Sequence, residues 1–172
     1  MGMNNSRNFD LLTLGQVLLR LSPPDNERLS RGDTFVKQVG GAELNVAVGA
    51  ALLGLHTGVI SKLPAHDIGS FMKGKIRSFG VSDDFFMYDQ SSSARVGIYY
   101  YENGAYPRKP KVIYDRNNSS FFSLNIDEIP EEVYTASKCF HTTGITLALN
   151  EDIRETTIDM IKRFKAAGTL VS

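Results

Sequence analysis

The chain has 172 residues, of which 42% are hydrophobic and 22% are charged, and this composition is typical of one globular domain with an apolar core. Its 19 basic and 19 acidic residues give a net charge of zero, which argues against nucleic acid and membrane surfaces as partners. A single cysteine, Cys139, excludes an internal disulfide and a cysteine-based metal cluster. Residues 1–8 are polar and no apolar run has the length of a membrane span, so we expect a cytoplasmic protein.

The first half of the chain alternates strand-like and helix-like segments. The apolar run 9–15 ends at a glycine and predicts a buried strand, while segments 17–21 and 34–39 fit an antiparallel ribbon. Residues 42–53 are apolar on nearly every side, which predicts a helix buried all round. The next predicted elements are a strand over 57–61, a helix over 68–79 and a strand over 85–88. This order predicts right-handed crossovers and a mostly parallel sheet flanked by helices.

The alternation is interrupted between residues 91 and 117. Two strand-like runs, 95–102 and 111–116, flank a turn-rich sequence around Pro107 and predict a hairpin. The α/β pattern then returns with a strand over 138–142, a helix over 151–167 and a strand from Thr169. Because parallel strands normally have neighbours on both sides, we expect the domain to continue beyond Ser172.

Two glycines stand at the predicted junction between a strand and a helix, in the sequence Val39-Gly40-Gly41-Ala42-Glu43-Leu44-Asn45. Glycine lets the backbone approach a ligand closely, and the first N–H groups of the helix can bind ligand oxygens. Asn45 would lie one helical turn further on the same side. The same residues also fit a tight turn in which Asn45 caps the helix or fills a polar gap. The spacing matches neither a dinucleotide fingerprint nor a phosphate-binding loop.

A second candidate site combines tyrosines with an arginine on the predicted hairpin. The period of two places Tyr99 and Tyr101 on one face of their strand and Tyr100 on the other. Tyr114 and Arg116 share one face of the partner strand. Such a face suits a polyhydroxy acid, because a guanidinium can pair with the carboxylate while phenols bond to hydroxyl groups. The alternative is that tyrosine only reflects strand propensity and the arginine is solvated.

Segment 141–146 follows a predicted strand and would lie at the carboxyl edge of the sheet, where open α/β sheets bind ligands. We expect His141 to be a structural histidine, and the spacing of the three histidines does not fit a metal site. Glu43 and Asp67 are expected to be solvated rather than catalytic.

Taken in order, these motifs resemble those of the ribokinase-like (PfkB) carbohydrate kinases over nearly the whole chain from Leu11. Residues 40–45 are similar to the family's sugar-binding signature Gly-Gly-Ala-x-x-Asn. The stretch from Glu102 to Arg116 resembles the 2-keto-3-deoxygluconate kinase branch more than ribokinases or fructokinases. One departure is Gln16, which stands where members of the family usually carry a glutamate.

The resemblance implies a ribokinase-like α/β fold with a core formed by residues 1–16, 40–90 and 118–172. Residues 17–39 and 91–117 would form a small β-sheet lid over the sugar, and the lid would also make the contact of a homodimer. The implied substrate-binding residues are Gly40, Gly41, Asn45, Tyr99, Tyr114, Arg116 and Thr146.

The implied activity is phosphorylation of a sugar acid, 2-keto-3-deoxygluconate, by the whole protein with ATP and Mg²⁺. In this family the catalytic base aspartate and the nucleotide pocket belong to segments that would follow Ser172. We therefore expect no catalytic residue and no metal ligand within this chain. The alternatives are a kinase for a neutral sugar such as fructose or ribose, which would not need Arg116, and a non-catalytic sugar-binding fragment.

Overall fold

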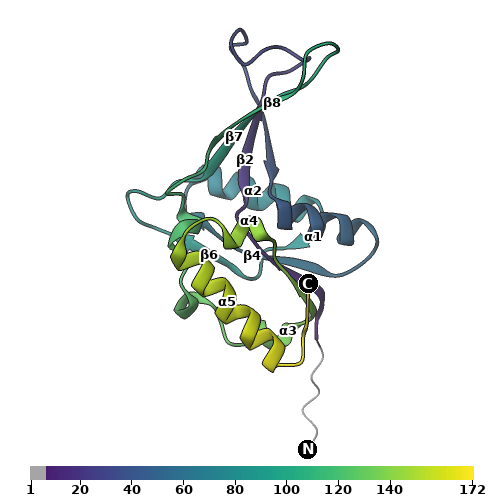
Figure 1. Cartoon of the computed structure of the whole chain (residues 1–172), viewed down its shortest axis with the longest axis vertical. Helices are drawn as coiled ribbons and strands as arrows, with labels where there is room; N and C mark the ends of the chain where they lie inside the picture. The colour runs from purple at the N-terminus through teal and green to yellow at the C-terminus, as the bar shows by residue number, and fades with distance from the viewer. Residues whose placement is uncertain (1–6) are drawn as a thin grey trace, which may run out of the picture.

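The computed structural model describes residues 7–172, whose strands form a larger and a smaller sheet (Figure 1). The larger sheet contains β1 (Phe9–Leu14), β4 (Thr57–Pro64), β5 (Val81–Ser82), β6 (Phe86–Asp89), β9 (Ser137–His141) and β10 (Leu170–Val171). The strand order is β10-β9-β1-β4-β5, with β6 also paired to β4, and every pair is parallel. The predicted parallel sheet is therefore confirmed. Strand β4 extends beyond the predicted Ser61 to Pro64 because its second half pairs with β6.

Helices cover both faces of this sheet. They are α1 (Ala42–Leu52), α2 (Asp67–Ser78), α3 (Val133–Ala136), α4 (Gly144–Leu147) and α5 (Glu151–Ala166), with 3₁₀ turns at Ser120–Ser123 and Ile126–Glu128. Ile60 packs in the core beside α5, whereas its neighbour Val59 packs in the core beside α1 and α2. This alternation follows from the period of two of a strand and gives a sheet with a core on each side. None of the helices in residues 7–172 is long and apolar enough to cross a membrane.

The smaller sheet projects from one end of the core (Figure 1). Its strands are β3 (Val36–Gly40), β2 (Leu18–Ser22), β7 (Gly97–Glu102) and β8 (Lys111–Asp115), in that order. Both predicted antiparallel ribbons, β2 with β3 and β7 with β8, are present, and a parallel pairing of β2 with β7 joins them. The two interruptions of the α/β pattern thus meet in one sheet.

The prediction that the first helix is buried all round is wrong. Only Glu43, Leu44 and Ala47 of α1 are buried, and Leu52 is 79% exposed. Helix α1 packs with one side against β1 and β4, so the apolar side chains on its other side face outward. The nearly uniform apolar composition hid which side faces the core.

Candidate functional site

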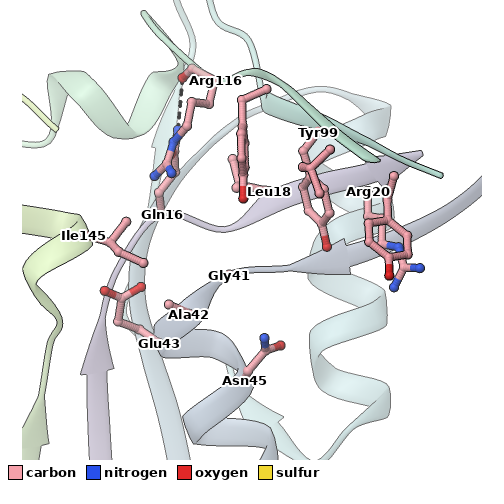
Figure 2. Close-up of a pocket in the computed structure, with 13 residues that line it drawn as sticks. Gln16, Leu18, Arg20, Gly41, Ala42, Glu43, Asn45, Tyr99, Arg116 and Ile145 are labelled. Carbon is pink, nitrogen blue, oxygen red and sulfur yellow. Dashed lines mark hydrogen bonds between the residues drawn. The ribbon is translucent and has the colours of Figure 1, made fainter. Parts of the chain in front are cut away.

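A cavity of about 310 Å³ lies between the small sheet and the start of α1 (Figure 2). It is lined by Gln16, Leu18, Arg20, Gly41, Ala42, Glu43, Asn45, Tyr99, Tyr101, Val112, Tyr114, Arg116 and Ile145. Five of the seven substrate-binding residues proposed from the sequence line this cavity, and Gly40 and Thr146 do not. The volume is at the lower end of the range of small-molecule sites, which suits a ligand the size of a monosaccharide.

The two glycines bring α1 to the cavity. Gly41 has a φ of 151°, in the region that favours glycine, and a Cβ there would lie 2.8 Å from the carbonyl oxygen of Gln16. Gly40 lies behind the cavity wall, where a Cβ would stand 2.5 Å from the Tyr99 hydroxyl. The first glycine thus leaves room for Tyr99, and the second lets the chain turn into α1 beside Asn45, which lines the cavity.

The aromatic wall of the cavity comes from β7 and β8. Tyr99 and Tyr114 stand opposite each other in the strand register, with ring centroids 5.9 Å apart. Tyr101 shares their side, and Arg20 of β2 lies over its ring at 4.3 Å from the centroid. Burial raises the pKa of Tyr99 above its usual value, so its phenol remains a hydrogen-bond donor at neutral pH. The predicted shared face of these tyrosines is confirmed.

Arg116 lies just beyond β8 at the end of the cavity that also holds Gln16 (Figure 2). Its Nε donates a hydrogen bond to Oε1 of Gln16 at 2.8 Å. Burial lowers the pKa of the guanidinium below its usual value, but an arginine remains charged at neutral pH. The nearby charge of Glu43 favours the charged form of Arg116, but within residues 7–172 no carboxylate forms a direct ion pair with this side chain.

Glu43 is buried, with 2% of its surface exposed, so the prediction of a solvated carboxylate is wrong. Its Oε1 accepts hydrogen bonds from the Thr143 amide at 3.2 Å, the Thr143 hydroxyl at 2.5 Å and the Thr146 hydroxyl at 2.8 Å. The turn that starts α4 therefore covers the first turn of α1 and supplies these donors. Thr146 lies behind this carboxylate and acts on the cavity through it. Asp67, by contrast, is exposed as expected.

Some lining residues were not among the substrate-binding residues proposed from the sequence, and Gln16 and Arg20 are two of them. Arg20 stands opposite Tyr99 in the pairing of β2 with β7, so it faces the cavity with the tyrosines. This pairing joins strands that lie far apart in the sequence, and no local pattern reveals it. Ile145 belongs to segment 141–146, which was expected at the carboxyl edge of the sheet, and it reaches the cavity from α4.

The cysteine and the histidines were also considered as a nucleophile and as metal ligands. Cys139 is partly buried in β9, and burial raises the pKa of its thiol, which disfavours the nucleophilic thiolate. His141 has one ring nitrogen near the Ser172 hydroxyl at 3.3 Å, while Nε2 is buried without a partner in the part of the chain described. No three His, Cys, Asp or Glu side chains among residues 7–172 are grouped to hold a metal ion.

Comparison with known proteins agrees with this arrangement. Residues 8–171 match the profile of the pfkB family carbohydrate kinases. The chain is 38% identical over 160 residues to 2-dehydro-3-deoxygalactonokinase of Haloferax volcanii, covering 93% of this chain and 49% of that protein. It is 29% identical over 169 residues to 5-dehydro-2-deoxygluconokinase of Clostridium beijerinckii, covering 98% and 49%.

The fold is also similar to a solved structure of 2-dehydro-3-deoxygluconokinase from Thermotoga maritima. The TM-score is 0.89 at 35% sequence identity, and the match covers 95% of this chain and 49% of that one. The chain thus spans about half the length of the relatives it matches. The family profile matches nearly all of the chain, and the sheets and helices have the ribokinase-like arrangement. The chain therefore belongs to the pfkB family of carbohydrate kinases.

Proposed function

We propose that this chain provides the substrate site of a kinase that phosphorylates a sugar acid, most specifically 2-keto-3-deoxygluconate (2-dehydro-3-deoxygluconate). The observation that carries the proposal is Arg116, a partly buried guanidinium that lines the cavity and has no carboxylate partner among residues 7–172. A carboxylate is the best geometric match for a guanidinium, because the two groups can form two parallel hydrogen bonds.

The rest of the cavity suits the hydroxyl and keto groups of such an acid. The phenols of Tyr99 and Tyr114 and the amide of Asn45 offer donors and acceptors at the walls. The start of α1 at Gly41 adds backbone N–H groups, which bind ligand oxygens well. In the proposed complex the carboxylate pairs with Arg116 and the polyol chain extends along the tyrosines.

The names of the relatives support an acid as substrate but differ in its identity. The three proteins are named as kinases of 2-dehydro-3-deoxygalactonate, 5-dehydro-2-deoxygluconate and 2-dehydro-3-deoxygluconate. These compounds share the carboxylate and differ in keto position or hydroxyl configuration. We favour the last because the similarity to the Thermotoga maritima enzyme extends over nearly all of this chain and includes the fold.

Phosphoryl transfer itself we assign to the whole protein, with ATP as donor and Mg²⁺ as the accompanying ion. Residues 7–172 contain no group of three His, Cys, Asp or Glu side chains that fits a metal ion. We propose that the base aspartate and the nucleotide site lie outside these residues. The small sheet would then act as a lid that excludes water and as the contact of a cytoplasmic homodimer.

Calorimetry with Arg116→Ala tests the acid assignment. We expect binding of 2-keto-3-deoxygluconate to weaken about 10- to 100-fold, because a hydrogen-bonded charge pair contributes about 1.5–3 kcal/mol. Binding of the neutral carboxamide of the same acid should change little. Arg154→Ala, on the exposed surface of α5, is the matched control and should leave both ligands unaffected. An equal loss for acid and carboxamide would contradict the pairing of the carboxylate with Arg116 and favour a neutral sugar. No binding of the acid to the folded wild-type chain would contradict the proposed substrate site itself.

A further inference from the structure

Arg20 of β2 is a second guanidinium that lines the cavity beneath the small sheet. Figure 2 shows it at the end opposite Gln16 and Arg116, with Tyr99 between the two ends. In the strand register Arg20 stands opposite Tyr99, and Tyr99 stands opposite Tyr114. Arg116 follows two residues after Tyr114 and also lines the cavity. The cavity therefore has a cationic side chain at each end.

The contacts of Arg20 hold its guanidinium in place and leave part of it free. Its Cζ lies over the ring of Tyr101, 4.3 Å from the centroid, and a cation is attracted to the face of an aromatic ring. Its Nε donates a hydrogen bond to Oγ of Ser22 at 3.0 Å. Within residues 7–172 the two terminal nitrogens have no hydrogen-bond or ion-pair partner. Arg20 can therefore present both of them to oxygen atoms of a ligand.

The surroundings of the two arginines differ in charge. Glu43 is the one carboxylate among the residues that line the cavity, and it lies at the same end as Arg116 (Figure 2). Its charge acts on the guanidinium of Arg116. Arg20 instead faces Tyr99 and contacts Tyr101. At this end of the cavity, the hydroxyl groups of a ligand would meet a cation among neutral side chains.

The separation of the two arginines suits a ligand of limited length. From Arg116 to Arg20 the sheet spans two strand spacings and two residues along the strands, which is about 12 Å between the backbones. A six-carbon acid is about 6 Å long between its end carbons, and the C–O bond and hydrogen bond at each end add about 3 Å. A four-carbon acid is about 2.5 Å shorter. We therefore expect the longer acid to reach Arg20 while its carboxylate is held by Arg116.

We propose that Arg20 is a substrate-binding residue that donates hydrogen bonds to the hydroxyl groups on the last two carbons of the sugar acid, so that the cavity selects acids about six carbons long. This inference rests on the proposed sugar-acid function, in which Arg116 holds the carboxylate. It adds a residue that distinguishes ligands by their length to one that distinguishes them by their charge.

The matched probe is the four-carbon acid 2-keto-4-hydroxybutanoate, which shares the carboxylate, the keto group and the first four carbons of 2-keto-3-deoxygluconate and lacks the last two. Because the two acids carry the same charge, the ratio of their affinities reports contacts at the far end of the cavity. We expect calorimetry on the folded wild-type chain to show a preference of about tenfold or more for the six-carbon acid.

Arg20→Met should lower this preference about tenfold, because it removes charge-assisted hydrogen bonds to the far hydroxyl groups. Binding of the four-carbon acid should change less than about threefold, since salt largely screens a charge about 12 Å from the carboxylate. The matched control is Arg28→Met, which makes the same change at an exposed arginine outside the cavity and should leave both affinities unchanged.

The outcomes separate this inference from the function on which it rests. If neither acid binds to the folded wild-type chain, the sugar-acid proposal itself fails. If both acids bind equally well, or if folded Arg20→Met keeps the full preference or weakens both acids equally, the role of Arg20 is overturned. If Arg20→Met does not fold, NMR of the ¹⁵N-labelled wild-type chain decides. The Arg20 side-chain signal should shift with the six-carbon acid and not with the four-carbon acid, and no such difference would overturn the role.

Discussion

The carboxylate of Glu43 connects the cavity to the structure beneath it. It is buried, and all three of its hydrogen bonds come from the turn that begins α4. An acceptor that satisfies buried donors is costly to remove, because the donors are left without partners. The residue therefore holds α1 and α4 together at the cavity wall.

Glu43→Ala is accordingly expected to lower the free energy of unfolding by about 2 kcal/mol, because three donors lose their acceptor. Glu43→Gln keeps an oxygen in the same position and should lose about 1 kcal/mol or less. Urea denaturation followed by circular dichroism measures both values. A loss below about 0.5 kcal/mol for Glu43→Ala would mean that water replaces the carboxylate at little cost.

Asp10 links the amino-terminal end of strand β1 to its neighbours. One carboxylate oxygen pairs with Nζ of Lys138 on β9 at 2.7 Å, and the other accepts from the backbone N–H of His56 at 2.9 Å. These contacts hold the pKa of Asp10 below its usual value, the hydrogen bond from Lys138 most of all. A carboxyl group whose pKa is lower in the folded state stabilises that state above its unfolded pKa, and this stabilisation is lost as the pH falls through the folded pKa.

Asp10→Asn should therefore lower the Tm at pH 7 relative to the wild-type chain, and the difference should shrink as the pH falls below about 4. Thermal unfolding at pH 7, 5 and 3, values around the usual pKa of an aspartate near 3.9, follows the change. Asp84→Asn is the control, because Asp84 is exposed and forms no ion pair within residues 7–172. A difference that stays constant or grows on acidification would contradict the assignment.

At the same scale, the sequence predicts the elements whose pattern is local. Strands β1 and β4 contain apolar runs, β9 contains the apolar pair Cys139-Phe140, and helices α2 and α5 show one buried side. Each of these appears within a few residues of its predicted range. The short elements β5, α3 and α4 escaped prediction, because a strand of two residues or a single helical turn carries no measurable period.

Among the residues of the site, too, those that follow a local pattern could be predicted and those that depend on distant contacts could not. Tyr99, Tyr101 and Tyr114 could be placed on one face because each strand of a hairpin has a period of two. The roles of Gln16 and Glu43 could not be predicted, because each depends on contacts between segments about 100 residues apart. Such contacts arise only when distant segments come together in the folded chain.

For the molecule as a whole, the volume of a cavity does not decide where the ligand binds. A second cavity, of about 300 Å³, lies between α5 and the 3₁₀ turns, and its lining includes Asp152, Glu155 and Asp159. These carboxylates would repel a sugar acid, whereas the first cavity offers Arg20 and Arg116 against the single carboxylate of Glu43. The charge of the lining therefore favours the cavity beneath the small sheet.

The most direct measurement of the central claim is an NMR titration of the ¹⁵N-labelled chain with 2-keto-3-deoxygluconate. We predict saturable shifts of the backbone amides of Gly41 and Asn45 and of the Arg116 side chain, with no change at Asp152 or Glu155. Saturable shifts confined to the second cavity, or none anywhere in a folded sample, would contradict a sugar-acid site between the small sheet and the start of α1.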